Sequence, residues 1–380
     1  MATLVRTMNY LFKEAKLGPD FCKKELTEIK KLIDQSTSFS VVGIPAMGIS
    51  IFLKYLVTTK LAEFVHIDIN DLPSLDKLSF LKLIYKELGG DKENTSEQGL
   101  IDLIKRKLET IITQHERVVI VFNRFDRLKK EFNQNFFANL RSIRDVDKEK
   151  IVMVFAANHP LPHEAPQALI GGNLNMFSKT FYLKPYSKED LEKLTELNAP
   201  NLKTGDEFFY KALRLSGGHY QLCQLLLKSD PRMEDPLSDQ AIKLQVKELY
   251  EYLNYKQRRQ LQKLALGKKL SRIDRFLTDI GFIDQQNNLL SPLLVDYIKL
   301  NVRFRLSVKE SQLFQLLKNK KGKLVSKDEI FSGLWGEDNE EATDWALNSL
   351  IYRLRKNPTF IASGYIIESQ KKVGYSLIKV

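Results

Sequence analysis

Short apolar runs separated by helical patterns are the feature of this sequence that most constrains its fold. Four runs have the composition of buried strands, at Phe39–Val42, Phe64–Asn70, Arg117–Phe122 and Ile151–Ala157. Amphipathic helical patterns lie between them, for example at 78–88 and 99–114. Apolar strands that alternate with helices are typical of a mostly parallel sheet covered on both faces. We therefore predict an α/β fold for the N-terminal part of the chain.

After Tyr182 the strand pattern stops, and helical patterns follow at 187–197, 206–215 and around 221–227. From Ser238 short helices are closed by the hairpin pattern FIDQQNNLLSPLL, and from Ser307 the same order of elements ends in YIIESQKKVGYSLI. Pro231 and Pro236 bracket a predicted linker. We expect four domains: a parallel-sheet domain at 1–183, a helical lid at 184–237, and winged helices at 238–305 and 306–380.

A glycine-bearing turn joins the first predicted strand to a helix. The turn Gly43-Ile44-Pro45-Ala46-Met47-Gly48-Ile49-Ser50 matches the phosphate-loop pattern GxxxxGK[ST] at both glycines and at the hydroxyl. Ile49 stands where the pattern has its lysine, so the ammonium that reaches the phosphates is missing. The backbone N–H groups of such a turn still suit a phosphate. The candidate nucleotide contacts here are Gly43, Pro45, Gly48, Ile49 and Ser50; the alternative is an ordinary strand–helix turn.

The surroundings of this turn resemble the STAND and origin-recognition-like branch of the AAA+ P-loop ATPases. MGISIFLKYL is similar to the family's helix MGKSSLLRYL, and VVIVFNRFDRL to its strand VVIVLDEFDRL. IVMVFAAN is similar to its sensor strand, which places the sensor residue at Asn158, and LSGGHYQLCQLL resembles its lid motif. The resemblance implies a site for ATP or ADP with Mg²⁺. It places the Mg²⁺-linked position on Asn123 and the water-activating position on Arg124.

Three departures from the family pattern, at Ile49, Asn123 and Arg124, each remove a charge on which phosphoryl transfer depends. Losing one such interaction commonly costs about 10²–10³ in rate. We therefore expect no efficient hydrolysis and name no catalytic residue. The backbone cradle leaves nucleotide binding open, and Arg124 standing in for the lost lysine is one hypothesis. An empty site kept as a scaffold is the other.

Residues 308–380 resemble the winged-helix DNA-binding domain of OmpR/PhoB-type response regulators. The resemblance rests on LFQLLKNKKGKLVSKDEIFSGLW, ATDWALNSLIYRLRKNP and YIIESQKKVGYSLI, and implies a third helix from about Glu341 to Lys356 that enters the major groove. Leu347, Leu350, Ile351 and Leu354 have the spacing of its core face. The candidate DNA contacts are Asn348, Tyr352, Arg353, Arg355 and Lys356 on this helix and Lys371 and Lys372 at the hairpin tip.

The charge distribution favours a polyanionic partner without proving one. The chain carries 59 Lys and Arg against 47 Asp and Glu, a net charge of +12, and residues 251–305 alone contribute +6. A second phosphate-contacting surface on this segment is therefore plausible. Winged helices also serve as protein-docking modules, and basic helix ends also suit the helix dipole.

Composition excludes several classes of protein. No apolar run approaches the ~18–20 residues of a membrane span. Cys22 and Cys223 form no CxxC pair and the histidines have no metal-ligand spacing, so we expect a cytoplasmic protein with no structural metal. DNA is the expected partner, and an oligomer with itself or with a competent ATPase is compatible with the resemblance. The leading hypothesis is a DNA-binding pseudo-ATPase; the alternatives are a slow ATP/ADP switch and a protein-interaction scaffold.

Overall fold

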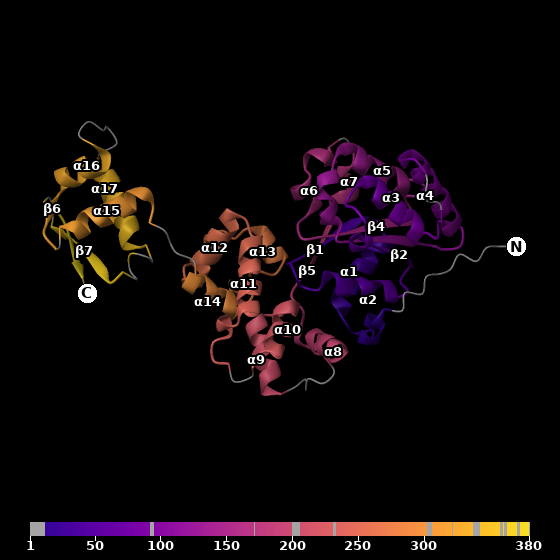
Figure 1. The fold of residues 1–380 in the computed structure, drawn as a ribbon, viewed down its shortest axis with the longest axis horizontal. Coiled ribbons are helices and arrows are strands. Elements are labelled where there is room, and N and C mark those ends of the chain that lie inside the picture. The colour runs from indigo at the N-terminus through magenta and orange to yellow at the C-terminus, as the bar shows by residue number, and fades with distance from the viewer. Residues whose placement is uncertain are drawn as a thin grey trace. The chain divides into compact units, whose positions relative to one another are not determined.

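A computed structural model describes the chain at residues 12–91, 95–170, 172–199, 206–230, 233–301, 306–320, 322–336, 343–357, 360, 363–370 and 373–379. The chain divides into two compact units, 1–299 and 300–380. Unit 1 contains the parallel sheet and a helical region, and unit 2 contains helices and a small antiparallel sheet (Figure 1).

Unit 1 is built on a five-stranded parallel sheet with the strand order β2-β3-β4-β1-β5. Every residue of β1, β3 and β4 is buried, as expected for strands whose two faces are both covered. The α/β fold class predicted from the sequence is confirmed. The strands are β1 Phe39–Gly43, β2 Glu63–Asp68, β3 Val118–Asn123, β4 Ile151–Ala157 and β5 Thr180–Leu183.

Helices cover both faces of this sheet, with α1 and α2 on one side and α3, α4 and α5 on the other (Figure 1). The second side packs on alternate residues of the strands and on a cluster of phenylalanines that includes Phe80, Phe122, Phe136 and Phe155. These helices are α1 Lys23–Asp34, α2 Ile49–Thr58, α3 Lys77–Glu87, α4 Glu97–Ile112, α5 Gln134–Arg144, α6 Leu161–Glu164 and α7 Leu174–Phe177, with 3-10 turns at Lys13–Leu17, Ile69–Asp71, Phe125–Glu131 and Gln167–Leu169.

The second strand ends earlier than the sequence predicted. Its apolar alternation continues to Asn70, but β2 stops at Asp68 and a 3-10 turn follows. The reason is local, because the Asp68 carboxylate accepts the backbone N–H of Asn70 at 3.0 Å and so bends the chain away from the sheet.

The rest of unit 1 is helical, as the sequence predicted. Ile283 and Leu289 form an isolated antiparallel bridge at the predicted hairpin. The helices are α8 Lys188–Asn198, α9 Glu207–Ser216, α10 Tyr220–Lys228, α11 Gln240–Tyr252, α12 Tyr255–Ala265, α13 Arg275–Asp279 and α14 Pro292–Asn301, with a 3-10 turn at Pro236–Ser238.

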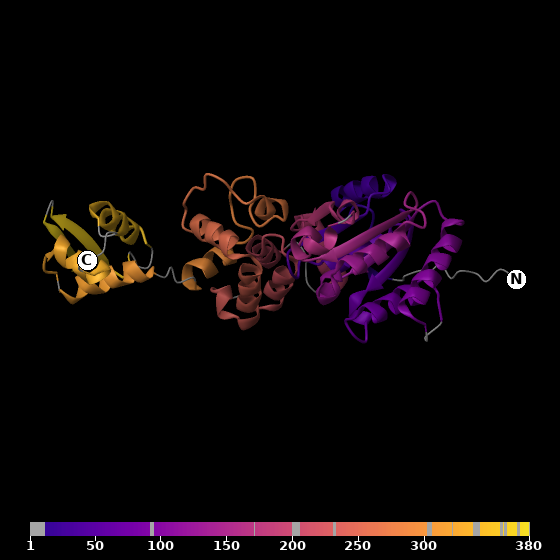
Figure 2. The ribbon, with the colours of Figure 1, turned by 90° about the horizontal axis from the view of Figure 1, so that it is seen from above.

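Unit 2 packs three helices against the antiparallel sheet β6-β8-β7 (Figure 2). The predicted core face of the third helix is confirmed, since Leu347, Leu350, Ile351 and Leu354 are all buried. This helix begins after Thr343, whose side chain accepts the N–H of Ala346. The elements are α15 Val308–Asn319, β6 Val325–Ser326, α16 Lys327–Trp335, α17 Asp344–Arg355, β7 Tyr365–Gln370 and β8 Gly374–Lys379.

The turn between α9 and α10 tolerates only glycine at residue 217. Gly217 ends α9 with φ +61°, and a Cβ there would lie 1.6 Å from the backbone oxygen of Leu290. Gly89 also has a positive φ, of +77°, but a Cβ there would meet nothing within 4 Å. Comparing alanine substitutions at Gly217 and Gly89 therefore separates the cost of backbone strain from the cost of steric overlap.

We predict that Gly217→Ala lowers the free energy of unfolding of unit 1 by about 3 kcal/mol, against about 1 kcal/mol for Gly89→Ala. Urea unfolding followed by far-UV circular dichroism measures both. Tryptophan fluorescence does not report on unit 1, because Trp335 and Trp345 both belong to unit 2. Equal losses in the two variants would show that the contact with Leu290 relaxes freely.

Candidate functional site

The glycine loop, residues 43–50, connects the carboxyl end of β1 to the first turn of α2. Gly48 precedes the helix with φ 100°, a conformation that glycine adopts without strain. The first N–H groups of a helix have no intrahelical acceptor, so the start of α2 suits an anion. The side chain of Ile49 lies against Gly43, because a Cβ added at Gly43 would approach the Ile49 side chain to 3.0 Å. Ile49 thus packs on the loop where the pattern has an extended lysine.

Three carbonyl oxygens of the glycine loop accept hydrogen bonds from the helical region. His219 Nε2 bonds the oxygen of Pro45 at 2.8 Å, the Gln221 N–H donates to Ala46 at 3.3 Å, and the Tyr186 hydroxyl donates to Gly48 at 3.2 Å. His219 and Tyr186 are buried. His219 Nδ1 also accepts the N–H of Leu222, so the neutral imidazole carries its proton on Nε2. We call these contacts the lid latch; the lid holds the loop through groups of the protein itself.

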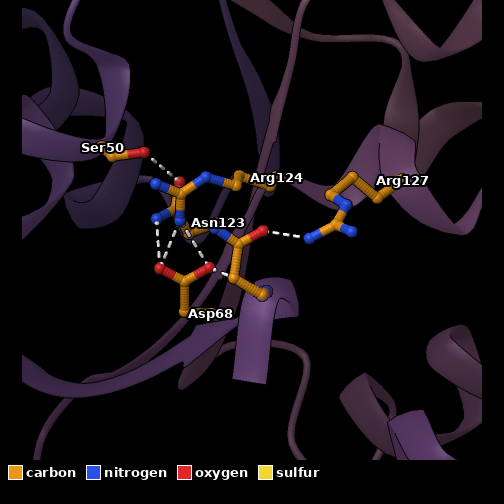
Figure 3. A network of polar contacts seen from close by, with 6 residues as sticks. Ser50, Asp68, Asn123, Arg124 and Arg127 are labelled. Atoms are coloured by element: carbon orange, nitrogen blue, oxygen red, sulfur yellow. Dashed lines mark hydrogen bonds and ion pairs between the residues drawn. The ribbon is translucent and has the colours of Figure 1, made fainter. Parts of the chain in front are cut away.

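A chain of polar contacts runs from the glycine loop across the ends of β3 and β2 (Figure 3). The Ser50 hydroxyl donates to Asn123 Oδ1 at 3.0 Å, and Asn123 Nδ2 donates to the Asp68 carboxylate at 3.0 Å. The Arg124 guanidinium donates to the same carboxylate at 2.6 Å. The hypothesis that Arg124 replaces the missing lysine is therefore not favoured, since its guanidinium is held by Asp68.

The Asp68 carboxylate is stabilised in its charged form. Burial would raise its pKa, but hydrogen bonds from Arg124 and from the Asn70 backbone, together with the charge of Arg124, lower that pKa below its ordinary value. Arg124 itself has φ 60°, so its backbone adopts the left-handed conformation at the end of β3. Arg127 donates to the side-chain oxygen of Asn70 and completes the network (Figure 3).

Asn158, the predicted sensor residue, follows β4 at the edge of the same site. Its N–H and its Nδ2 both donate to Asp126, at 3.1 and 2.9 Å, and burial raises the pKa of that carboxyl. The Asn158 carbonyl accepts the hydroxyl of Tyr252, at the end of α11. The neighbouring His159 ring stacks on Tyr252 with a centroid distance of 4.4 Å. This contact joins the edge of the sheet to α11, in the segment predicted to be the first winged helix.

Together these groups line a cavity of about 490 Å³. Of the predicted nucleotide contacts, Gly48, Ile49, Ser50, Asn123 and Asn158 line it, whereas Gly43 and Pro45 do not. The remaining lining residues are Ala46, Met47, Arg124, Asp126, Arg127, Ala156, Ala157, Tyr220 and Gln221.

The side chains around this cavity do not fit Mg²⁺, which prefers carboxylate oxygens and water in an octahedral set. Asp68 is bound by Asn123 and Arg124, and Asp126 is bound by Asn158. Across the described ranges, no group of three or more His, Cys, Asp or Glu could hold a metal ion. The cavity and the start of α2 do fit the phosphates of a nucleotide. The site therefore suits the phosphates of a nucleotide better than it suits Mg²⁺.

The predicted DNA contacts on α17 fall into two groups. Asn348 and Arg355 are held by the wing: the Tyr375 hydroxyl donates to Asn348 Oδ1 at 2.7 Å, and Arg355 donates to the Ile367 carbonyl at 2.8 Å and to Ser369 at 2.6 Å.

Tyr352, Arg353 and Lys356 make up the second group and point outward. Arg353 Nε lies 3.7 Å from Glu310 with its side chain 59% exposed, and Lys356 lies over the Tyr352 ring. Lys371 and Lys372 lie outside the described residues.

The segment predicted to be the first winged helix also presents cations. Arg258 lies over the Tyr250 ring, and Arg275 pairs with Asp279 at 3.3 Å. The exposed cations of α12 and the loop after it are Lys256, Arg259, Lys263, Lys268, Lys269 and Arg272.

Several residues of the site were not predicted from the sequence. Asp68 could have been found, because a polar residue at the carboxyl end of a buried parallel strand lies at the edge where such sheets bind ligands. Its pairing with Arg124 could not, since the two are 56 residues apart. Tyr186 and His219 also reach the loop only through the tertiary fold.

The strand, the glycine loop and the helix, set in a five-stranded parallel sheet, define unit 1 as an α/β protein of P-loop type with altered polar residues. Residues 301–377 match the family described as "Transcriptional regulatory protein, C terminal". This match confirms the resemblance inferred for the C-terminal segment. In the described part of the chain, no helix has both the length and the apolar character needed to cross a bilayer.

Several solved structures are similar to this chain at low sequence identity. The Orc1 protein of Aeropyrum pernix, solved in complex with DNA, is 11% identical with a TM-score of 0.40, covering 96% of this chain and 91% of that chain. A Walker-type ATPase of Pyrococcus abyssi is 12% identical with a TM-score of 0.47, covering 75% and 96%. The Cdc6p protein of Pyrobaculum aerophilum is 13% identical with a TM-score of 0.39, covering 96% and 93%. No relative of curated function matches the chain.

We predict that the lid latch makes unit 1 sensitive to mild acid. Burial lowers the pKa of His219 to about 4, whereas an unfolded histidine titrates near 6.5. As the pH falls from about 6.5 to about 4, the unfolded chain gains a proton that the native imidazole does not. The free energy of unfolding therefore decreases by about 1.4 kcal/mol per pH unit within that window.

Calorimetric unfolding at several pH values tests this dependence. His66, whose pKa burial also lowers to about 4, contributes in the same direction, so the informative quantity is the difference between wild type and His219→Gln. The variant should lose the His219 share of the slope. Identical slopes would mean that His219 is protonated in the native latch.

Proposed function

We propose that this protein is a DNA-binding regulatory platform whose P-loop module does not hydrolyse ATP. The observation that carries the proposal is the match of residues 301–377 to the C-terminal domain of transcriptional regulators, joined to a third helix that turns one face outward. The cations of α12 and the loop after it supply a second surface of suitable charge. Contacts with phosphates would supply most of the affinity, and contacts with base edges the specificity.

The absence of hydrolysis rests on the contacts around the cavity. Phosphoryl transfer depends on positioned positive charge and on a group that orients the attacking water. Here Ile49 packs on the loop, Asn123 bridges Ser50 to Asp68, and Arg124 is paired with Asp68. Each group is engaged with the protein, so the expected arrangement for turnover is missing.

Nucleotide binding without turnover is the second candidate, and the cavity at the start of α2 favours it. ATP or ADP would then act as a structural ligand or a slow switch. Because the carboxylates nearby are already bound, we expect Mg²⁺ to add little to such binding. Thermal stabilisation by ADP in EDTA and in Mg²⁺ separates this candidate from an empty scaffold, since a ligand of the native state raises its stability.

We predict that DNA affinity falls steeply with salt and that α17 contributes to it. In a titration of a fluorescent duplex, the double variant Arg353→Ala/Lys356→Ala should reduce the slope of log affinity against log salt by about 2, one for each lost phosphate contact. Arg355 is left intact because it holds β7 in place.

Two further variants locate the contact. Lys82→Ala/Lys86→Ala removes the same charge from the exposed side of α3 and should leave the slope unchanged. Lys268→Ala/Lys269→Ala reports on the first winged helix. A slope that changes equally in all three variants would reflect net charge alone, and no salt-dependent binding would favour the protein-scaffold alternative.

We predict that purified protein releases no phosphate from ATP, with or without DNA. A Ser50→Ala variant identifies contaminating activity, because it removes the one hydroxyl of the loop that lines the cavity. Any release measured in wild type should persist unchanged in this variant. Release that falls in Ser50→Ala would show genuine turnover and contradict the pseudo-ATPase proposal.

A further inference from the structure

The outward face of α17 carries two large aromatic side chains. Trp345 is 80% exposed and Tyr352 is 59% exposed, the former being the most exposed large hydrophobic residue among those described. They are seven residues apart, so they lie on the same face of the helix about 10 Å apart along its axis. Exposing a tryptophan to water is costly, so such a stripe indicates a contact surface. We call these two residues the aromatic stripe.

Two polar residues of α17 that would normally read bases are exposed but already have hydrogen-bond partners within unit 2. Asn348 accepts the Tyr375 hydroxyl, and Arg355 is held by the Ile367 carbonyl and Ser369. At the start of the helix, Asp344 pairs with Lys327 at 2.8 Å. The stripe is therefore a large part of what α17 offers to a partner.

The charge beside the stripe indicates which partner it fits. Arg353 and Lys356 lie exposed at the carboxyl end of α17, next to Tyr352. Cations beside aromatic rings suit a surface that is apolar in its groove and anionic along its edges. In the major groove of duplex DNA, the thymine C5-methyl is the apolar group available to a helix, and phosphates flank it.

We propose that Trp345 and Tyr352 make α17 a reader of thymine methyl groups in the major groove. The proposal rests on the proposed DNA-binding function and adds a specificity to it. The two rings, about 10 Å apart, span about three base-pair steps of about 3.4 Å. Recognition is then by apolar contact, and it discriminates thymine from uracil as well as A·T from G·C.

Replacing thymidine by deoxyuridine tests this directly, because it removes the methyl group and keeps the phosphates and base pairing. The probes are an A·T duplex of about 30 base pairs and its deoxyuridine counterpart. A single methyl contact is worth about fourfold in affinity, so wild type should bind the thymidine duplex at least about fourfold more tightly. The double variant Trp345→Ala/Tyr352→Ala removes both rings of the aromatic stripe and should bind both duplexes equally.

The control is Val308→Ala, which removes another exposed apolar side chain of unit 2, 75% exposed on α15, and should keep the thymidine preference. In a Trp335→Phe background, the emission of Trp345 should also shift to shorter wavelength on binding. Equal affinity of wild type for the two duplexes overturns the thymine-reading proposal. If that equal binding still depends on salt, the proposed DNA-binding function stands. A thymidine preference that survives in Trp345→Ala/Tyr352→Ala also overturns it, and no binding to either duplex overturns both.

Discussion

The ion pair between Arg124 and Asp68 is the interaction on which the altered P-loop site depends. An arginine at the carboxyl end of β3 would be costly beside a low-dielectric sheet unless a carboxylate neutralised it. Asp68 lies on the neighbouring strand and does so, while the Asn123 amide bridges the pair to Ser50. Where the resemblance predicts acidic residues, Asn123 and Arg124 instead form hydrogen bonds with neighbouring side chains of the protein. Removing one partner alone would leave an unpaired charge at the end of the sheet.

The lid latch has a related consequence for the mobility of unit 1. Here His219, Tyr186 and the backbone of Gln221 hold the loop carbonyls through the protein alone. Gly217 and Gly218 pack closely on Leu290 and Tyr186, so the turn that precedes His219 is also held in place. Hydrogen bonds within the protein therefore join the glycine loop to the predicted lid and oppose their separation.

Much of this fold could be predicted from the sequence, because its main strands are continuous apolar runs and α17 has a regular apolar period. The end of β2 could not, since the side chain of Asp68 stops the strand within an unbroken alternation. At the site, the glycine loop was found by its spacing. The partners of Arg124, Asn348 and Arg355 were not, because they come from distant strands, and no spacing reveals them. On α17, Asn348 and Arg355 stay predicted DNA contacts, and the structure adds that both also hydrogen-bond to the hairpin.

The position of Asn158 limits what a nucleotide could do if it binds. Asn158 lines the cavity and its side chain donates to Asp126, while its carbonyl accepts the hydroxyl of Tyr252. Tyr252 and His159 stack together and meet Phe276 of α13, next to the exposed Arg275. A ligand that displaced Asn158 would therefore disturb α11 and α13 through contiguous contacts. A switch would require two alternative arrangements of this joint. The buried ring of Phe276 opposes such a displacement, because moving it exposes apolar surface. This cost favours the proposed platform, whose DNA contacts would be fixed by the fold, over a switch whose contacts would change when nucleotide binds.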